Sequence, residues 1–256
     1  MLRLLAAPPG RLTLAQIVAS LDLAKGTAHG IVRTLVEVGF VEQDARTGKY
    51  RLADALLELG STYPDPNEVR ARSMNWADPL AARTGQSVQV GVLASDDHSE
   101  VLLVHHVFRP NGSAQQLETG ARFPSHATAM GKILLAYSSS RSPGVLTAFT
   151  QRTITDQRTL TEALRTIRAI GHAVDLEEYA HGTASIAVPI HGNGGLVVAA
   201  VAVTGDPAEL CDAGARAKPA LLTRLHDCAR HIAGELATAR TSAFALVRAP
   251  TVRETR

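Results

Sequence analysis

Cysteine is scarce in this sequence, which has only two among 256 residues, Cys211 and Cys228. Two distant cysteines do not make a disulfide framework, so we expect reduced thiols and a cytoplasmic location. Long hydrophobic runs are also missing, because the longest, 195–203, is far shorter than the roughly 20 residues that a membrane helix needs. Residues 1–5 lack the length and cleavage pattern of a signal peptide and resemble the end of a helix, so we expect the natural N-terminus to extend further.

Neither sign of charge is in large excess, since 26 Lys and Arg stand against 24 Asp and Glu and the formal net charge is +2. A protein that binds nucleic acid over most of its surface would be far more basic, so any such surface must be local. The length suggests two domains, one of them small, and the 45% of hydrophobic residues is ordinary for a globular protein.

Motifs of common enzyme classes are absent: there is no Gly-x-Ser-x-Gly, no P-loop and no Gly-x-Gly-x-x-Gly, so we expect no enzymatic activity. A metal sensor is the alternative of another class, because the chain has ten histidines, two of them adjacent at His105 and His106. Adjacent residues of a strand point to opposite faces, and no Cys/His spacing resembles a zinc module. We therefore expect neither a metal nor another cofactor, and stoichiometric zinc in purified protein would revive the alternative.

The N-terminal residues have the element order of a winged helix-turn-helix. Pro8-Pro9-Gly10 ends a first helical segment, and Thr13 is an N-cap whose capping box Gln16 completes. The further elements expected are helices over 14–21 and 24–38, the second ended by Gly39, and strands over 40–43 and 49–52 joined by a turn over 44–48.

The helix over 24–38 has two distinct faces. Four apolar residues on one side are expected to face the core: Ala28, Ile31, Leu35 and Val38. Lys25, His29 and Arg33 are spaced four residues apart on the other side, as the donors of a recognition helix would be. Arginine suits a bidentate contact to guanine or phosphate, and lysine and histidine suit phosphate or base edges. The alternative is an ordinary solvated basic face.

Two glycines, Gly26 and Gly30, lie inside this helix beside the basic face, with Thr27 next to the first. Each glycine costs about 1 kcal/mol relative to alanine in a helix interior, so each needs a reason. Close approach of the helix backbone to the floor of the DNA major groove is one reason, and room for a neighbouring helix of the protein is the other.

The expected wing adds basic residues near its tip. Arg46 and Lys49 are placed to grip phosphate or enter the minor groove, whereas Arg51 can pair with Glu42 across the hairpin. The DNA-binding residues that we predict are Lys25, Gly26, Thr27, His29, Gly30, Arg33, Arg46 and Lys49.

The rest of the sequence predicts an α+β domain behind a helical linker. Pro64-Asp65-Pro66 breaks a helix over 53–63 and starts the linker helix, which runs to 83. The elements expected after it are strands over 87–94, 100–107, 172–177, 184–190 and 196–204 and helices over 126–137, 160–170 and 216–238. The predicted boundaries are 1–58 for the winged helix-turn-helix, 59–83 for the linker helix, 84–239 for the second domain and 240–256 for a disordered tail.

Several motifs, in one order along the chain, resemble the IclR family of bacterial transcriptional regulators. They are Leu14-Ala15-Gln16-Ile17, the runs Leu23–Leu35, Gly39–Asp44 and Tyr50–Leu52, and then His126–Lys132, Asp175–Glu178, Ser185–Ile190 and Val201–Gly205. The resemblance covers nearly the whole chain and implies a GAF-like effector-binding domain behind the winged helix. It implies double-stranded operator DNA and a small-molecule effector as partners, a homodimer or tetramer, and no role for a membrane. The Pro64–Pro66 break departs from the longer helical linker that is usual in the family.

The resemblance also implies an effector pocket beside the sheet. Its lining would be His126, Ala129, Met130, Asp175, Ser185, Ala202 and Thr204. Free N–H groups where the helix after His126 starts suit an anionic head group, hydroxyls of Ser185 and Thr204 suit a polyol or carboxylate, and Asp175 can accept from ligand hydroxyls. Without the resemblance, Ser185 and Thr204 are equally well plain strand residues. Arg122 and Lys132 are further candidates for a phosphate, although we expect Lys132 on a solvated helix face.

The match is closest to members of the family that regulate glycerol-utilisation operons, through Lys25–Ile31, His105–Pro110 and Ala184–His191. The family more often has serine and arginine in place of Gly26 and Gly30, and cysteine in place of Ser185, so these departures indicate a subgroup. The resemblance therefore implies a repressor of a glycerol-utilisation operon that glycerol 3-phosphate or glycerol releases from DNA. A regulator that responds to another small organic acid is the alternative.

Overall fold

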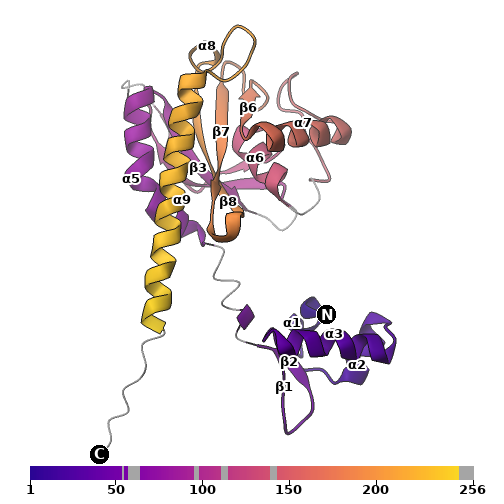
Figure 1. Cartoon of the computed structure of the whole chain (residues 1–256). Coiled ribbons are helices and arrows are strands. Elements are labelled where there is room, and N and C mark those ends of the chain that lie inside the picture. Colours follow the sequence, from indigo (N-terminus) through magenta and orange to yellow (C-terminus); the bar gives the residue numbers. More distant parts are fainter. Residues whose placement is uncertain (54, 57–63, 95–97, 111–114, 139–142, 248–256) are drawn as a thin grey trace, which may run out of the picture. The chain divides into compact units, whose positions relative to one another are not determined.

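The computed structural model describes residues 1–53, 55–56, 64–94, 98–110, 115–138 and 143–247. The chain divides into two compact units, Met1–Tyr63 and Pro64–Arg256 (Figure 1). Most of the helix predicted over 53–63 lies outside the described residues. No helix among the described residues is long and apolar enough to cross a membrane.

The smaller unit is a winged helix, as predicted. Its elements are α1 (Leu2–Ala6), α2 (Leu14–Leu21), α3 (Lys25–Glu37), β1 (Val41–Gln43) and β2 (Tyr50–Leu52). The capping box of α2 is formed, because Gln16 N donates to Thr13 Oγ1 and Thr13 N donates to Gln16 Oε1 at 2.8 Å. Gly39, with φ +77°, follows the end of α3. The two strands pair antiparallel, which places Glu42 opposite Arg51.

The core of the smaller unit corrects the predicted inner face of α3. Ala28 and Val32 are buried, and Leu35 packs against the core. Ile31 and Val38, predicted to lie inside, are 41% and 51% exposed. On a helix of 3.6 residues per turn these two lie about 60–80° to one side of Ala28, whereas Val32 and Leu35 flank it closely. The buried stripe is therefore narrower than predicted and turned toward Val32.

The larger unit is built on one antiparallel sheet of six strands, in the order β5-β4-β3-β8-β7-β6. The strands are β3 (Ser87–Leu93), β4 (Glu100–Val107), β5 (Arg122–Pro124), β6 (Ala173–Leu176), β7 (Ala184–His191) and β8 (Val197–Gly205). The helices are α5 (Pro66–Thr84), α6 (Ala129–Tyr137), α7 (Gln157–Ile170), α8 (Pro207–Leu210) and α9 (Pro219–Val247), with a short 3-10 turn at Asn193–Gly195.

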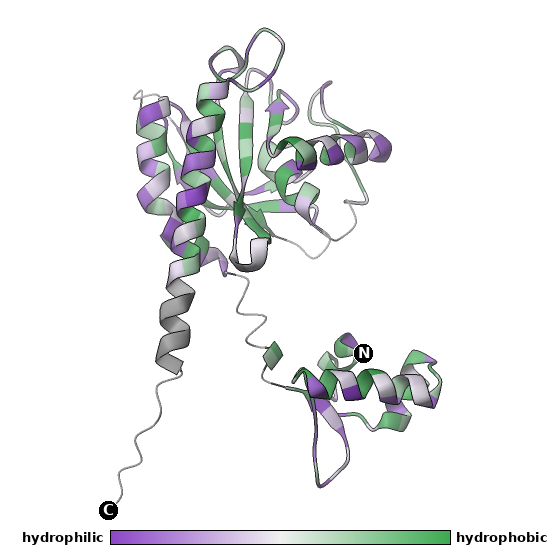
Figure 2. Ribbon diagram, in the orientation of Figure 1, coloured by the Kyte–Doolittle hydropathy of each residue, from purple (hydrophilic) through white to green (hydrophobic). Residues whose placement is uncertain are grey.

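Helices cover both faces of this sheet (Figure 1). α5 and α9 lie side by side on one face, and α6, with α7 beside it, lies on the other. Figure 2 shows the apolar strands between helices whose outer sides are hydrophilic. Val69 of α5 and Ile232 of α9 are fully buried in the core of the first face, and Met130 and Ile133 of α6 belong to the core of the second. The predicted α+β class is confirmed.

Several elements of this unit differ from the predicted ones, and α7 begins at Gln157 instead of 160. α6 begins at Ala129 instead of 126, because Thr128 is its N-cap and accepts a hydrogen bond from Gly131 N at 3.3 Å. The short elements β5 and α8 were not predicted. α9 runs over Pro219–Val247, where a helix was predicted over 216–238.

Candidate recognition helix and effector site

The predicted DNA-binding residues of α3 all lie at the surface of the smaller unit. Lys25, His29 and Arg33 are exposed along one side of the helix. Arg33 Nε lies 3.4 Å from Glu37 Oε1, and the two side chains are 72% and 63% exposed. Exposed pairs at this spacing contribute only about 0.3–0.5 kcal/mol, so the guanidinium can exchange this partner for DNA at little cost.

Gly26 and Gly30 do not make room for another part of the described chain. A Cβ at either position would meet none of the described heavy atoms within 4 Å, the backbone of α3 itself aside. Both glycines are exposed, as is Thr27 between them. The described structure therefore does not support room for a neighbouring helix as the reason for these glycines. Close approach of the helix backbone to DNA is the reason that is left.

The turn of the wing is ordered by a single carboxylate. Asp44 Oδ1 accepts hydrogen bonds from Thr47 N and Arg46 N, both at 2.9 Å, and these two bonds hold the pKa of Asp44 below its usual value. Arg46 is exposed and Lys49 half-buried. Arg51 pairs with Glu42 across the hairpin, as expected, so it already has a carboxylate partner in the absence of DNA.

Most residues predicted to line the effector pocket meet on the α6 face of the sheet. Asp175 on β6 lies opposite Ser185 on β7, and Ser185 lies opposite Thr204 on β8. Ala202, two residues from Thr204, points to the same face and packs in the core beneath α6. Ser185 and Thr204 are joined by a hydrogen bond of 3.1 Å between their hydroxyls.

Two acceptor-bearing residues that the sequence analysis missed extend this line across the sheet. Gln89 Oε1 on β3 lies 3.1 Å from Thr204 Oγ1, and Gln89 Nε2 donates to Glu118 Oε2 at 2.7 Å. We call Asp175, Ser185, Thr204, Gln89 and Glu118 the polar row. A glutamine between two valines of strand β3 is the sequence signal that would have pointed to it. Glu118 precedes β5, and no sequence pattern around it predicts that it belongs to the polar row.

A glycine on β3 lets α6 pack close to the sheet. A Cβ on Gly91 of β3 would lie 3.3 Å from Met130 Sδ. Gly131 of α6 packs instead against the backbone of Ser125, which precedes the helix. A Cβ on Gly131 would lie 2.2 Å from Ser125 O and would clash with it. Ala129 and Met130 are buried in the first turn of α6, where N–H groups have no partner within the helix.

Lys132 is buried, which corrects the prediction of a solvated side chain. It is 3% exposed, its Nζ donates to Val174 O at 2.8 Å, and it forms an ion pair with Glu178. Burial raises the pKa of Glu178, and Lys132 opposes that shift. The partner follows β6, far from α6 in the sequence, so helix periodicity alone could not reveal it. The ion pair lies at the Asp175 end of the polar row.

Asp175 is buried, with 5% of the residue exposed. Burial raises the pKa of Asp175 to about 6. Two neighbours act in the opposite direction and lower it: the Glu178 N–H, which donates to Asp175 Oδ1 at 2.7 Å, and the ammonium of Lys132. Near neutral pH this group is therefore mostly an ionised acceptor in a poorly solvated place.

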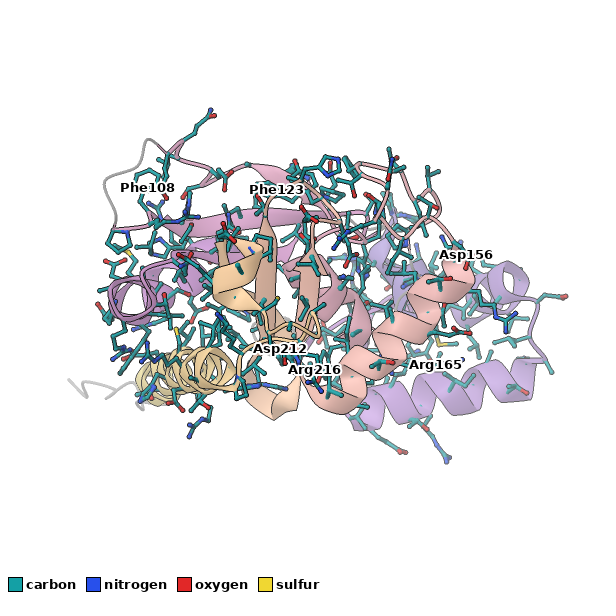
Figure 3. The ribbon with its side chains drawn as sticks, turned by 90° about the horizontal axis from the view of Figure 1, so that it is seen from above. Phe108, Phe123, Asp156, Arg165, Asp212 and Arg216 are labelled. Atoms are coloured by element: carbon teal, nitrogen blue, oxygen red, sulfur yellow. The ribbon has the colours of Figure 1, made fainter. Side chains whose placement is uncertain are left out.

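His126 and Arg122 make their hydrogen bonds outside the polar row, and His126 is near enough to Glu178 to lower the pKa of that carboxyl. His126 precedes the N-cap of α6, its Nε2 lies 2.9 Å from Thr147 O, and its ring contacts Phe149. Phe149 and Phe123, the second of them labelled in Figure 3, both contact the ring of Tyr179, so His126 adjoins an aromatic cluster. Arg122 pairs with Glu100 at the surface, with 3.1 Å between Nη1 and Oε2.

The two adjacent histidines point to different partners. His105 Nε2 lies 3.7 Å from Asp78 of α5, whereas His106 Nε2 lies 2.8 Å from Ser87 Oγ. Burial lowers the pKa of both rings. Within the part of the chain that the structure describes, no group of three or more His, Cys, Asp or Glu side chains is arranged to hold a metal ion.

Comparison with known proteins agrees with this architecture. The family descriptions "IclR helix-turn-helix domain" and "Bacterial transcriptional regulator IclR C-terminal" match residues 1–45 and 62–234. The glycerol operon regulatory proteins of Streptomyces coelicolor and Streptomyces griseus are 48% and 45% identical to the chain over 244 residues, which is 94% of each sequence. The crystal structure of an IclR homolog from Microbacterium hydrocarbonoxydans, complexed with 4-hydroxybenzoate, shares the fold with a TM-score of 0.58 and 24% identity, over 88% of this chain and 91% of that one. The chain therefore belongs to the IclR family of bacterial transcriptional regulators.

Proposed function

We propose that this regulator represses a glycerol-utilisation operon and that a glycerol metabolite releases it from its operator. The observation that carries the operon assignment is the 48% identity to the Streptomyces coelicolor glycerol operon regulatory protein, over 94% of both chains. The protein acts in the cytoplasm as a homodimer or tetramer on a palindromic site, and it needs no catalysis for this role.

In this proposal α3 enters the major groove. Arg33 and His29 read base edges or phosphate, and Lys25 adds a phosphate contact near the helix start. Gly26 and Gly30, with open space beside them, let the helix backbone approach the bases, and Thr27 lies on the same exposed turn. Arg46 and Lys49 of the wing hold the flanking backbone or the minor groove.

Replacing Arg33 tests this face. The variant Arg33→Ala should lose about 1–3 kcal/mol of operator binding, the value of one good bidentate contact. Arg158→Ala on α7 is a matched control, because Arg158 also pairs with a glutamate one turn on, at 3.2 Å, and is 88% exposed. A gel shift that shows undiminished operator binding by Arg33→Ala would remove α3 from the proposal.

The polar row supports an uncharged polyol as the effector. Asp175 and Glu118 accept hydrogen bonds when ionised, and Lys132, whose buried ammonium acts on Asp175, is already paired with Glu178. Hydroxyl groups of a polyol can donate to such acceptors, whereas a phosphate would add negative charge beside them. Between the two metabolites, the chemistry of the row therefore favours glycerol over glycerol 3-phosphate.

A small organic acid is the second candidate. It is favoured by the N–H groups of Ala129 and Met130 at the start of α6, which suit a carboxylate, and by the family relative that holds 4-hydroxybenzoate. Either ligand acts by binding one conformation of the larger unit better than another, which shifts the equilibrium between DNA-bound and free protein.

A thermal-shift comparison of glycerol, glycerol 3-phosphate and 4-hydroxybenzoate separates these candidates. Glycerol also stabilises proteins as an excluded cosolvent, so Asp175→Asn serves as the control for that general effect. We expect glycerol to raise the melting temperature of the wild type at low millimolar concentration and to lose this effect in the variant. Equal stabilisation of both proteins by glycerol, or a shift with 4-hydroxybenzoate only, would contradict the glycerol assignment.

A further inference from the structure

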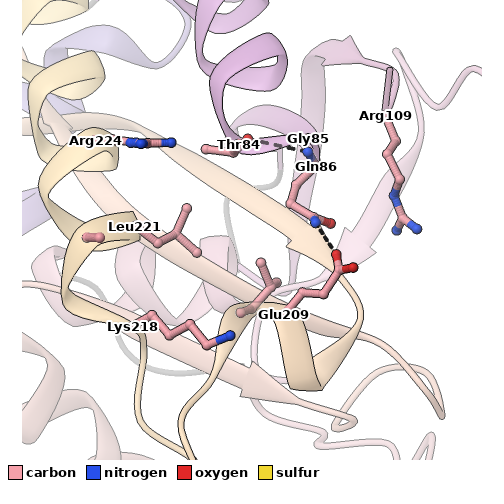
Figure 4. A pocket seen from close by; sticks show the side chains of 10 residues that line it. Thr84, Gly85, Gln86, Arg109, Glu209, Lys218, Leu221 and Arg224 are labelled. Atoms are coloured by element: carbon pink, nitrogen blue, oxygen red, sulfur yellow. Dashed lines mark hydrogen bonds between the residues drawn. The ribbon is translucent and has the colours of Figure 1, made fainter. Parts of the chain in front are cut away.

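The larger unit contains a cavity of about 540 Å³ where the end of α5 meets α8 and the first turns of α9 (Figure 4). Arg109, Lys218 and Arg224 line it together with Gln86 and Glu209. None of the residues of the polar row lines this cavity. By the alternation of an extended chain, Gln86 shares the side of Val88, which lies in the core beneath α5 and α9, whereas Gln89 of the polar row points to the α6 side.

The charge of this cavity is not balanced. Three cationic side chains line it against the single carboxylate of Glu209. Lys218 Nζ donates to Ala208 O at 2.8 Å, and Arg224 Nη1 donates to Arg83 O at 2.6 Å. These bonds fix the two side chains in place without neutralising them. Among the described residues, none of the three cations has a carboxylate oxygen within 4 Å.

Arg109 differs from the other two cations because its buried Nε has no hydrogen-bond acceptor among the described residues. Its backbone is held by Gln115, whose Oε1 accepts from Arg109 N at 2.7 Å and whose Nε2 donates to Arg109 O at 2.9 Å. Its Nε is buried and has no hydrogen-bond partner in the described part of the chain. Its side chain runs from the end of β4 along the wall of the cavity (Figure 4). A buried guanidinium N–H without an acceptor is unfavourable, so the side chain gains by turning toward an anion.

Gly205, at the end of β8, keeps this corner open to polar side chains. A Cβ there would lie 1.9 Å from Gln86 Oε1 and 3.6 Å from Arg109 Nη2. Gln86 is in turn oriented by its hydrogen bond to Glu209 (Figure 4). The bare backbone of Gly205 thus admits the amide and the guanidinium side by side.

We propose that this cavity binds a phosphate oxyanion, either inorganic phosphate or the phosphate group of a small metabolite. Arginine presents a planar fork of donors that matches phosphate, and lysine adds a compact charge. Arg109 supplies the fork, and Lys218 and Arg224 hold the opposite wall at fixed positions. The site lies beyond the proposed function and does not depend on it, since neither operator DNA nor glycerol takes part.

Titration calorimetry on the full chain tests the site, with inorganic phosphate and methyl phosphate added at an ionic strength matched by chloride. We expect saturable binding that Arg109→Gln weakens by roughly tenfold or more, since charge-assisted hydrogen bonds have about that value. Arg216→Gln is the matched control, because Arg216 is 82% exposed, pairs with Asp212 (Figure 3), and does not line the cavity. The tighter of the two ligands identifies the source of the phosphate.

Arg109→Lys keeps the charge without the fork and should bind with intermediate affinity, so the proposal stays testable if Arg109→Gln does not fold. Asp175→Asn should bind phosphate as the wild type does, which separates this site from the effector site. No saturable heat with either phosphate, or equal affinity in wild type and Arg109→Gln, would overturn the proposal.

Discussion

Replacing Asp175 by asparagine should make the larger unit more stable and less responsive to its effector. The carboxyl has a pKa near 3.8 in an unfolded chain and about 6 in the folded one. Between these pH values the folded state binds more protons than the unfolded state, so its stability falls as the pH rises. A shift of this size corresponds to on the order of 3 kcal/mol lost by pH 7.

Asparagine removes this loss and keeps an amide oxygen that can accept from Glu178 N in place of Asp175 Oδ1. At pH 7.5 the variant should therefore unfold at a higher urea concentration than the wild type, and the difference should vanish near pH 4. Trp76, the only tryptophan, reports on the larger unit, because it belongs to α5 and stacks on His231 of α9 with ring centroids 4.1 Å apart. Its fluorescence is the readout.

Glu162→Gln on the exposed side of α7 is the control for removing a carboxylate, since the Glu162 side chain is 61% exposed. It should leave the pH dependence of unfolding unchanged. If Asp175→Asn is no more stable than the wild type at pH 7.5 and shows the same slope of stability against pH, then desolvation of Asp175 is not the cost that we infer.

Three further substitutions have definite expected outcomes. Gly30→Ala should keep or raise the melting temperature, since the added Cβ meets open space and alanine favours helix by about 1 kcal/mol, yet it should weaken operator binding in a gel shift. Gly131→Ala should lower the melting temperature by the equivalent of about 1–3 kcal/mol through a backbone clash, whereas Gly234→Ala in α9, with nothing within 4 Å among the described residues, should not. Lys132→Met should lower the free energy of unfolding, measured with urea, by about 3–5 kcal/mol, because it leaves Glu178 buried without its partner. Adding Glu178→Gln should recover part of that loss. A loss below about 1 kcal/mol would show that the pair is solvated.

Local patterns predicted the winged helix well because its elements are set by neighbours in the sequence. The capping box of Thr13 and Gln16 and the positive φ of Gly39 are interactions within one turn of chain. The inner face of α3 was misjudged because Ile31 and Val38 are apolar and lie near the buried stripe without joining it. Which edge of an amphipathic helix is buried depends on the elements that pack against it. The positions of the apolar residues around the helix axis do not reveal those elements.

The candidate effector site was only partly predictable. Asp175, Ser185 and Thr204 were predicted through the family resemblance, and strand pairing brings them together. Gln89 was missed because its partners come from other strands and loops, and Lys132 because its counter-charge follows β6. Contacts between elements that are distant in the sequence produce neither a hydrophobic periodicity nor a local motif, so a single sequence does not predict them.

We propose that a glycerol metabolite controls DNA binding by this chain. Fluorescence anisotropy of labelled promoter DNA from the glycerol operon, with the full chain bound and glycerol then added, tests it most directly. We predict tight binding that glycerol reverses in the wild type but not in Asp175→Asn. A complex that neither glycerol nor glycerol 3-phosphate dissociates, or no preference for that promoter over unrelated DNA, would contradict the claim.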